Sequence, residues 1–471
     1  MQVWDGISDA RIQLLASELV RPSHERLTTG QHAPEMARLT ENLNLQRALL
    51  RQLQSQDVHA TLLDKTRVAS IVSEQPLSSS SSPWPVVQTN TNRRLRARLL
   101  VGADGPSSPV RAFSKIESFG WNYDARAVVA TLQHSASGIT SLGLPRPSTT
   151  AYQRFLPTGP IAFLPLAPGR ASLVWSTTPE LAEALLGAGP EVLSVMINAA
   201  FRLPEVSIAY LHKLLLSRWA AVRAGKEGGS QITAEEFVDA VQWRESSHSI
   251  EPFSVLSSFE DLQGGVPSAD IELFPPLIQS IQPNSAASFP LRMSHAEGYV
   301  GPRTALLGDA AHTVHPLAGQ GLNLGLADAD SLAGCIVNGI KYGADLGSRT
   351  SLADYARARY FENHTMISAT DKLQKLYGTR LGPIVWARSV GLEVVNEWTG
   401  LKGGLMRAAG GSVEPRRRHG GGDGGLVWTA AASGVSAISA IADTGRTLAG
   451  MVAGMVGNGM SVGERRGSGG E

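Results

Sequence analysis

The chain has a single cysteine, almost no net charge and no convincing membrane-spanning segment, and each of these absences excludes a class of protein. The one thiol, Cys335, excludes a disulfide framework within the chain and a metal site built from several cysteines. A formal net charge of +1 removes the broad cationic surface of a nucleic-acid-binding protein, so no nucleic acid is expected as a partner. Residues 426–442 are uncharged but only weakly apolar, and they fall short of the ~20 residues that a membrane span needs.

The start of the chain carries no targeting signal. Residues 1–5, MQVWD, are followed neither by a charged segment with an apolar core nor by an amphipathic segment rich in Arg and Ser. The sequence therefore encodes no address of its own, and we expect it to begin inside a longer pattern.

The composition is that of a globular protein with a large core. Hydrophobic residues make up 42% of the 471 residues and charged residues 18%, which disfavours disorder. At roughly 150 residues per domain, this length fits two or three domains.

Hydrophobic periodicity divides the chain into alternating strands and helices. Strands are predicted at 95–101, within 127–177, at 288–293 and at 304–307, and helices at 36–53, mostly over 179–250, at 322–340 and at 352–376. The serine run 78–82 predicts a surface loop. Because strands occur early and late with helices between them, the pattern predicts one α/β domain assembled from separated segments, with a second sheet inserted.

The most informative segment is residues 303–323, RTALLGDAAHTVHPLAGQGLN. A buried strand ends at Gly308, and Asp309 follows at its carboxyl end, where a carboxylate can accept hydrogen bonds from sugar or polyol hydroxyls. Pro316 stiffens the next loop, and Gly319 and Gly321 let backbone approach a ligand closely. A helix then begins at about Leu322, and its free N–H groups favour negative charge on whatever occupies the loop.

A second segment has a similar strand-turn-helix pattern. Residues 99–111, LLVGADGPSSPVR, predict a strand, a tight turn at Asp104-Gly105 and a helix that Ser108 caps. The turn lies at the carboxyl edge of the sheet, where open α/β sheets bind ligands.

Together these two segments resemble the FAD motifs of the flavoprotein aromatic hydroxylases, the group typified by para-hydroxybenzoate hydroxylase. The resemblance implies FAD as cofactor, with Asp104 and Gly105 near the pyrophosphates and Asp309 at the ribityl chain. It also implies a set of contacts to the isoalloxazine ring, made by Pro316, Gly319, Gly321, Leu322 and Asn323.

A finer resemblance points to the mitochondrial ubiquinone-biosynthesis branch of that family. It runs from residue 1 to about 408 and is weaker across 203–275. It rests on MQVWD at 1–5, WNYD at 121–124, QRFLPTGPIA at 153–162, LVWSTT at 173–178, FPLR at 289–292, and Tyr355, Arg359, Asn363, Asp371 and Lys372 through Leu376.

The resemblance implies a fold in four parts. A Rossmann-like FAD domain is expected over 1–120 and 288–345, a substrate domain with a mixed sheet over 121–287, and C-terminal helices over 346–402. Residues 403–471 are expected to form a Gly-rich linker and tail, whose stretch 426–442 is either an interfacial helix or loosely ordered.

One part of the family pattern has no counterpart. The family's strand, Gly-x-Gly-x-x-Gly turn and helix bind the ADP part of FAD, but here the glycine pattern occurs only at 420–425, behind RRRH and no strand. We therefore expect an incomplete FAD domain, with a truncated gene model or partial chain as the simplest explanation. The alternative is a non-catalytic homologue or assembly partner that binds no FAD.

The resemblance implies that reduced flavin and dioxygen hydroxylate the ring of a polyprenylated 4-hydroxybenzoate next to its existing hydroxyl. A flavin hydroxylase acting on a soluble phenol is a further reading. The branch also implies a ferredoxin-type electron donor, partner proteins of a ubiquinone-biosynthesis complex, and peripheral contact with the matrix side of the mitochondrial inner membrane.

The sequence names no catalytic residue. His312 and His315 lack further ligands at metal-binding spacing, so no metal site is expected, and no serine has the context of a nucleophile elbow. Arg154 is either a substrate-facing or a structural arginine.

Overall fold

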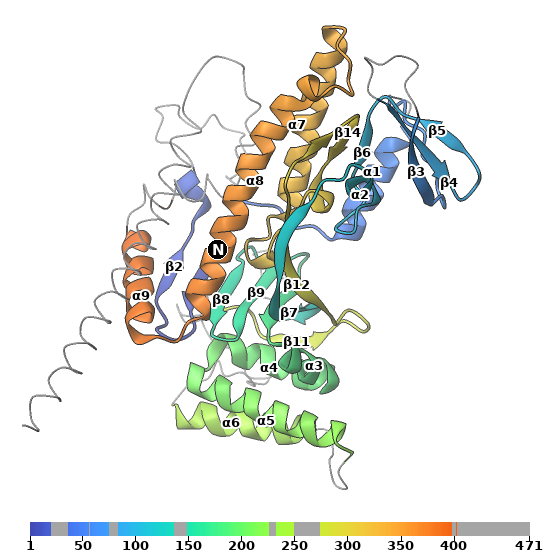
Figure 1. The fold of residues 1–471 in the computed structure, drawn as a ribbon. Coiled ribbons are helices and arrows are strands. Elements are labelled where there is room, and N and C mark those ends of the chain that lie inside the picture. The colour runs from blue at the N-terminus through green and yellow to red at the C-terminus, as the bar shows by residue number, and fades with distance from the viewer. Residues whose placement is uncertain are drawn as a thin grey trace, which may run out of the picture. The chain divides into compact units, whose positions relative to one another are not determined.

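The computed structural model describes residues 1–19, 36–55, 57–74, 83–135, 148–225, 232–248, 274–397 and 402 (Figure 1). The chain divides into two compact units, one formed by residues 1–9 and 37–378 and the other by residues 10–36 and 379–471. The first unit contains both sequence motifs.

A large mixed sheet organises the first unit. Its strand order is β15-β12-β7-β10-β9-β8-β1, and β11 also pairs with β7. Their bounds are β1 Gln2–Asp5, β7 Ser118–His134, β8 Tyr152–Leu156, β9 Gly159–Pro165, β10 Arg170–Thr177, β11 Ile278–Ile281, β12 Ala287–Ala296 and β15 His312–Thr313. β1 runs parallel to β8, and the other pairings are antiparallel.

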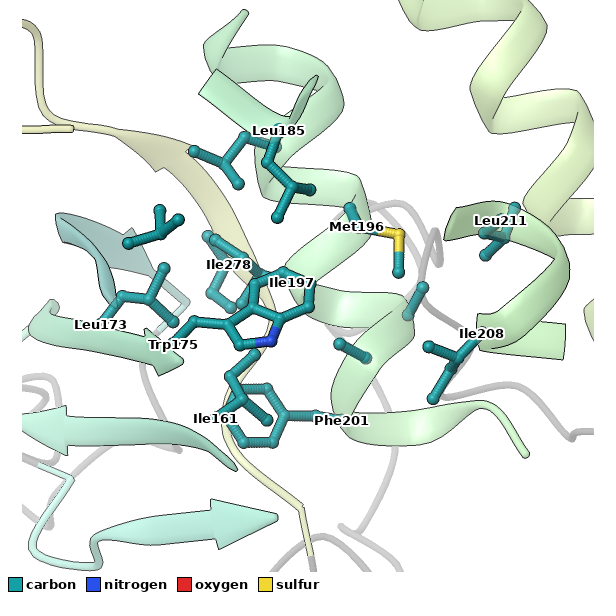
Figure 2. Packing of buried hydrophobic residues seen from close by; sticks show 14 of the residues in the cluster. Ile161, Leu173, Trp175, Leu185, Met196, Ile197, Phe201, Ile208, Leu211 and Ile278 are labelled. Carbon is teal, nitrogen blue, oxygen red and sulfur yellow. The ribbon is translucent and has the colours of Figure 1, made fainter. Parts of the chain in front are cut away.

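Four helices supply the apolar layer that covers this sheet. They are α3 (Pro179–Gly187), α4 (Pro190–Arg202), α5 (Glu205–Arg223) and α6 (Ala234–Ser247). Proline in the first turn suits the starts of α3 and α4, and the Thr178 and Thr233 hydroxyls cap α3 and α6. Figure 2 shows the resulting core, in which Trp175 of β10 lies among Leu185, Ile197 and Phe201.

A smaller layered region holds the two motifs. Its sheet has the order β13 (Val300–Gly301), β14 (Thr304–Leu306) and β6 (Leu100–Gly102). Helices α2 (Pro109–Phe113), α7 (Gly321–Lys341) and α8 (Arg349–Gly378) pack around it and share a second apolar cluster.

A third sheet stands apart from these layers. It consists of β3 (Val68–Glu74), β4 (Trp84–Thr89) and β5 (Arg94–Arg96), and β3 contacts α2 (Figure 1). Helix α1 (Asn42–Leu53) precedes it and has no buried residue.

In the second unit, described by itself, β2 (Arg11–Gln13) packs on α9 (Gly382–Glu397), and η1 (Ala16–Leu19) follows β2. The Gln13 amide donates to the Asn396 side chain at 3.0 Å.

The α/β class expected from the sequence is confirmed, as are the helices at α7 and α8 and the helical stretch after residue 179. The single strand predicted at 95–101 is wrong, because its two halves join different sheets. β5 pairs with β4, whereas β6 pairs with β14. The helix predicted from residue 36 begins only at Asn42, after an extended Glu41.

The four-part domain division stays a prediction, and the structure adds that β1 and most of β12 lie in the large sheet. The serine run 78–82 and the tail from residue 403 lie outside the described residues. Within the described part of the chain, no helix has the length and apolarity to cross a membrane.

We expect Trp175→Ala to lower the free energy of unfolding by about 3–5 kcal/mol, because it empties the centre of the main cluster. Trp243→Ala is the matched control, since that ring is 65% exposed, and it should change stability by less than about 1 kcal/mol. Urea unfolding of both purified variants, followed by far-UV circular dichroism, measures the difference. Equal losses would contradict the packing of Trp175.

Candidate flavin site

The two motifs lie at one edge of the small sheet. β14 pairs parallel with β6, so that Leu306 stands opposite Gly102, and the Leu307 amide continues the ladder to the Gly102 carbonyl at 3.0 Å. Each strand is followed by a turn that bears an exposed carboxylate, Asp104 after β6 and Asp309 after β14. The structure therefore brings both predicted acidic residues to the carboxyl ends of neighbouring parallel strands.

Arg111 ties these two turns together. Its guanidinium donates to the Ala310 carbonyl and to the Pro106 carbonyl, both at 2.7 Å. Arg111 is held in place because its own amide donates to the Ser108 hydroxyl, which caps α2 as the sequence predicted. Asp104 also fixes the start of α2 by accepting a hydrogen bond from the Val110 amide at 3.2 Å.

The backbone conformation favours glycine in both turns. Gly105 has φ +83° and Gly308 has φ +59°, values that strain any residue with a Cβ. Gly308 also lies close to α7, because a Cβ added at Gly325 would stand 3.4 Å from the Gly308 Cα.

The proline–glycine loop forms a short ordered bridge into α7. Pro316 starts the 3-10 turn η5 (Pro316–Ala318), the His315 Nδ1 accepts from the Leu317 amide at 3.1 Å, and the Gly319 amide donates to the Pro316 carbonyl at 2.9 Å. Gly319 is left-handed with φ +60°. The sequence therefore predicted correctly where the chain turns.

The N-terminus of α7 is uncapped by any side chain. Gly321 is its first residue, and the preceding Gln320 makes no capping hydrogen bond. Leu322 and Asn323 are exposed in the first turn, and the Asn323 side-chain Nδ2 donates to Gln320 Oε1 at 3.2 Å. Such a terminus presents N–H groups that favour a partly negative ligand.

A buried carboxylate holds these pieces in register. Asp328 of α7 is fully buried, and its Oδ2 accepts from the Gly308 amide at 3.0 Å and from His312 Nε2 at 2.6 Å. Its Oδ1 accepts from Arg359 Nε at 2.7 Å and from Asn363 Nδ2 at 3.0 Å, both on α8. One side chain thus joins the glycine turn, β15 and two helices.

Further hydrogen bonds extend this network. Asn363 Nδ2 also donates to the Tyr299 hydroxyl at 3.0 Å, and that hydroxyl pairs with His295 Nε2 at 2.9 Å. The Tyr355 hydroxyl of α8 donates to the Leu306 carbonyl, which clamps the end of β14.

The pKa shifts follow from this geometry. Burial acts to raise the pKa of the Asp328 carboxyl, but hydrogen bonds from His312, Arg359 and Asn363 outweigh it and hold that pKa below its ordinary value. Burial lowers the pKa of His315 to about 4, with the nearby Asp371 opposing the change. His315 is therefore neutral near pH 7, and its Nδ1 is free to accept the Leu317 hydrogen bond.

Sequence reasoning did not select Asp328, Arg111 or Tyr355 as site-forming residues. A weak signal existed for Asp328, because it is an acidic residue on the buried side of an apolar helix. Arg154 is structural, since it is buried and its Nη1 donates to the carbonyls of Ala200 and Leu203, at 2.9 and 2.8 Å. Among the described residues no group of three or more His, Cys, Asp or Glu side chains could hold a metal, and the absence of a metal site at His312 and His315 stays a prediction.

The described residues fit the flavin end of FAD. Exposed Asp309 can accept polyol hydroxyls, the backbone at Gly319 and Gly321 has open space beside it, and the start of α7 offers N–H groups to a polar ligand. For a Cβ at Gly321, the nearest other atom would be 3.7 Å away, so the backbone there is accessible.

Comparison with known proteins agrees with this assignment. Residues 274–359 match the family model described as an FAD binding domain. The chain is 35% identical to the mitochondrial ubiquinone biosynthesis monooxygenase COQ6 of Saccharomyces cerevisiae, over 85% of this chain and 78% of that protein. For the Homo sapiens protein of the same name the identity is 32%, over 87% of this chain and 75% of that one.

Among solved structures, p-nitrophenol 4-monooxygenase of Pseudomonas putida is 17% identical and covers 80% of this chain, with 72% of its own length matched and a TM-score of 0.46. The family model and these relatives identify a flavin-dependent aromatic monooxygenase that uses FAD. The chain belongs to the COQ6 family of ubiquinone biosynthesis monooxygenases.

We expect Asp328→Asn to lower the free energy of unfolding by about 3–5 kcal/mol, because it removes the fully buried carboxylate partner of Arg359 and leaves that guanidinium with only the exposed Glu362 as counter-charge. Asp330→Asn, an exposed carboxylate on the same helix, should change stability by less than about 0.5 kcal/mol. Thermal and urea unfolding of both variants measure the two changes. A loss in Asp328→Asn no larger than in the control would show that the network does not hold the fold.

His315 should make stability depend on pH. Its pKa is about 4 in the folded chain, against ~6.5 when unfolded, so below about pH 6.5 only the unfolded state takes up the proton. The free energy of unfolding therefore decreases as the pH is lowered. For this residue alone the decrease is about 2 kcal/mol from about pH 7 to pH 5.

The variant His315→Asn keeps an acceptor for the Leu317 amide but cannot titrate, so it should remove that share of the pH dependence. His59→Asn, at an exposed histidine, should leave the dependence intact. Urea midpoints at the two pH values compare them, and parallel pH profiles in wild type and His315→Asn would refute the assignment.

Proposed function

We propose that the chain binds FAD at the edge formed by β6 and β14 and hydroxylates the aromatic ring of a polyprenylated 4-hydroxybenzoate in ubiquinone biosynthesis. The observation that carries the proposal is the Arg111 clamp, which joins the Asp104 and Asp309 turns through the Pro106 and Ala310 carbonyls. Two glycine turns fixed side by side at parallel strand ends form a site for one extended ligand.

Each predicted residue has a role in this proposal. Asp309 accepts hydrogen bonds from the ribityl hydroxyls, and Asp104 with Gly105 lies near the pyrophosphate. The ring lies along the backbone of Pro316, Gly319 and Gly321, with Leu322 and Asn323 in the first turn of α7. When bound and reduced, FAD would supply the two electrons with which dioxygen puts one oxygen atom on the aromatic ring of the substrate and releases the other as water.

The chain's own residues do the positioning. The N–H groups at the start of α7 favour negative charge that develops at the near edge of the ring. Asp328 holds the Gly308 amide and thereby the backbone next to Asp309. No side chain is assigned as an acid or base, because ring hydroxylation with a bound cofactor needs mainly placement and exclusion of water.

We further propose that the protein works in mitochondria, in peripheral contact with the matrix side of the inner membrane. Relatives at 31–35% identity bear the name of a mitochondrial ubiquinone biosynthesis monooxygenase, which supports this placement. A ferredoxin-type protein is the proposed electron donor, and other proteins of the same biosynthetic complex are the proposed partners.

The purified chain should be yellow, with flavin absorbance near about 450 nm. Asp309→Ala should weaken FAD binding about 10- to 100-fold, because it removes a charged hydrogen-bond acceptor. Asp330→Ala, which removes an exposed carboxylate elsewhere on α7, is the control and should bind normally. Titration of the released and re-added flavin by fluorescence measures all three proteins.

A folded but colourless wild-type chain that takes up no added FAD would contradict the proposal and favour the alternative, a non-catalytic assembly partner. The substrate is tested separately by comparing 4-hydroxybenzoate with and without a prenyl tail. Mass spectrometry should find one added oxygen only on the tailed compound. Preference for the tailless phenol would contradict the proposed substrate class and indicate a soluble phenol instead.

A further inference from the structure

The tip of the small β3–β4–β5 sheet carries an unbalanced positive charge. Lys65 and Arg67 precede β3, and Arg93 and Arg94 lie at the start of β5. All four are exposed, and the described residues give them no salt bridge. Within residues 62–68 and 88–95 the only carboxylate is Asp64.

Backbone contacts bring these four residues to the same end of the sheet. The Asn90 amide donates to the Arg67 carbonyl at 2.9 Å, and the Arg67 amide donates to the Asn90 side chain at 3.0 Å. The Thr89 amide donates to the Arg93 carbonyl at 3.0 Å, which closes the β4–β5 turn. Two adjacent turns therefore bring these cationic residues to one end of the sheet.

Farther along the sheet the charge is balanced. Arg96 pairs with Glu74 at 2.7 Å, and its guanidinium lies 4.4 Å from the centre of the Trp84 ring. Arg96 thus has a carboxylate partner, whereas the four cations of the tip have no ion pair within the described part of the chain.

Exposed aliphatic side chains accompany the tip. Leu62, Val68 and Leu95 have 58%, 46% and 43% of their surface exposed. Cations beside exposed aliphatic groups suit the headgroup and upper acyl region of a bilayer, where both kinds of side chain find a partner. A purely acidic protein surface would match the cations but would offer the aliphatic groups no apolar partner.

We propose that the tip formed by Lys65, Arg67, Arg93 and Arg94, with Leu62, Val68 and Leu95 (the basic tip), docks on a membrane surface that contains anionic phospholipid. The choice of a bilayer as occupant rests on the proposed function, since a polyprenylated substrate is dissolved in lipid. The charge pattern itself does not depend on that function.

The test uses the purified full chain and sedimentation with lipid vesicles. Wild type should bind vesicles that contain phosphatidylglycerol, bind phosphatidylcholine vesicles far more weakly, and dissociate as salt is raised. Each cation near an anionic surface contributes ~1 kcal/mol, so Arg93→Gln/Arg94→Gln should lower the partition coefficient about 30-fold. Because both side chains are exposed, the variant should keep the wild-type melting temperature.

The control Lys213→Gln/Arg170→Gln removes the same charge from exposed positions on α5 and β10 and should bind as wild type does. Equal weakening in both double variants, equal binding to the two kinds of vesicle, or vesicle binding that Arg93→Gln/Arg94→Gln leaves unchanged would overturn the inference. The same variant is also assayed for FAD content and for hydroxylation of detergent-dispersed substrate. If both match wild type while its vesicle binding is also unchanged, the basic tip fails and the proposed function stands.

Discussion

The buried Asp328 carboxylate is the constraint on which the proposed flavin site depends. A charge without access to water is costly, so it persists only where every lone pair has a donor. Here the donors are a backbone amide at Gly308, an imidazole at His312, a guanidinium at Arg359 and a side-chain amide at Asn363. Because these donors come from a turn, a strand and a second helix, satisfying one charge fixes four separate parts of the chain at once.

Arg111 acts on the same turn from the other side. It is anchored to α2 and holds the Ala310 carbonyl, whereas Asp328 holds the Gly308 amide two residues earlier. Asp309, between them, is thus fixed at its backbone on both sides while its side chain stays exposed. A ligand that meets Asp309 encounters a carboxylate whose backbone is already held in place, which reduces the entropy lost on binding.

Local chemistry explains why part of this site could be predicted from the sequence. Gly308 and Gly105 need left-handed backbone, Ser108 caps a short helix and Pro316 starts a turn, and each of these is encoded within a few residues. The pairing of Asp328 with Arg359 could not be predicted, because it depends on how α7 packs against α8. The same limit explains the strand predicted at 95–101, since Leu95 pairs with the nearby Val87 whereas Val101 pairs with the distant Ala305 in another sheet.

The parallel pairing of β6 with β14 shows how locally encoded turns and long-range contacts combine. About 200 residues separate the strands, so their pairing has a high entropic cost and needs compensation from contacts that form only in the folded chain. The Arg111–Ala310 bond, the Tyr355–Leu306 bond and the Asp328 network are such contacts, and all converge within a few residues of β14. The polar groups that shape the proposed flavin site are therefore also those that hold β6 and β14 together. A change at Asp328 is expected to weaken the site and the fold at the same time.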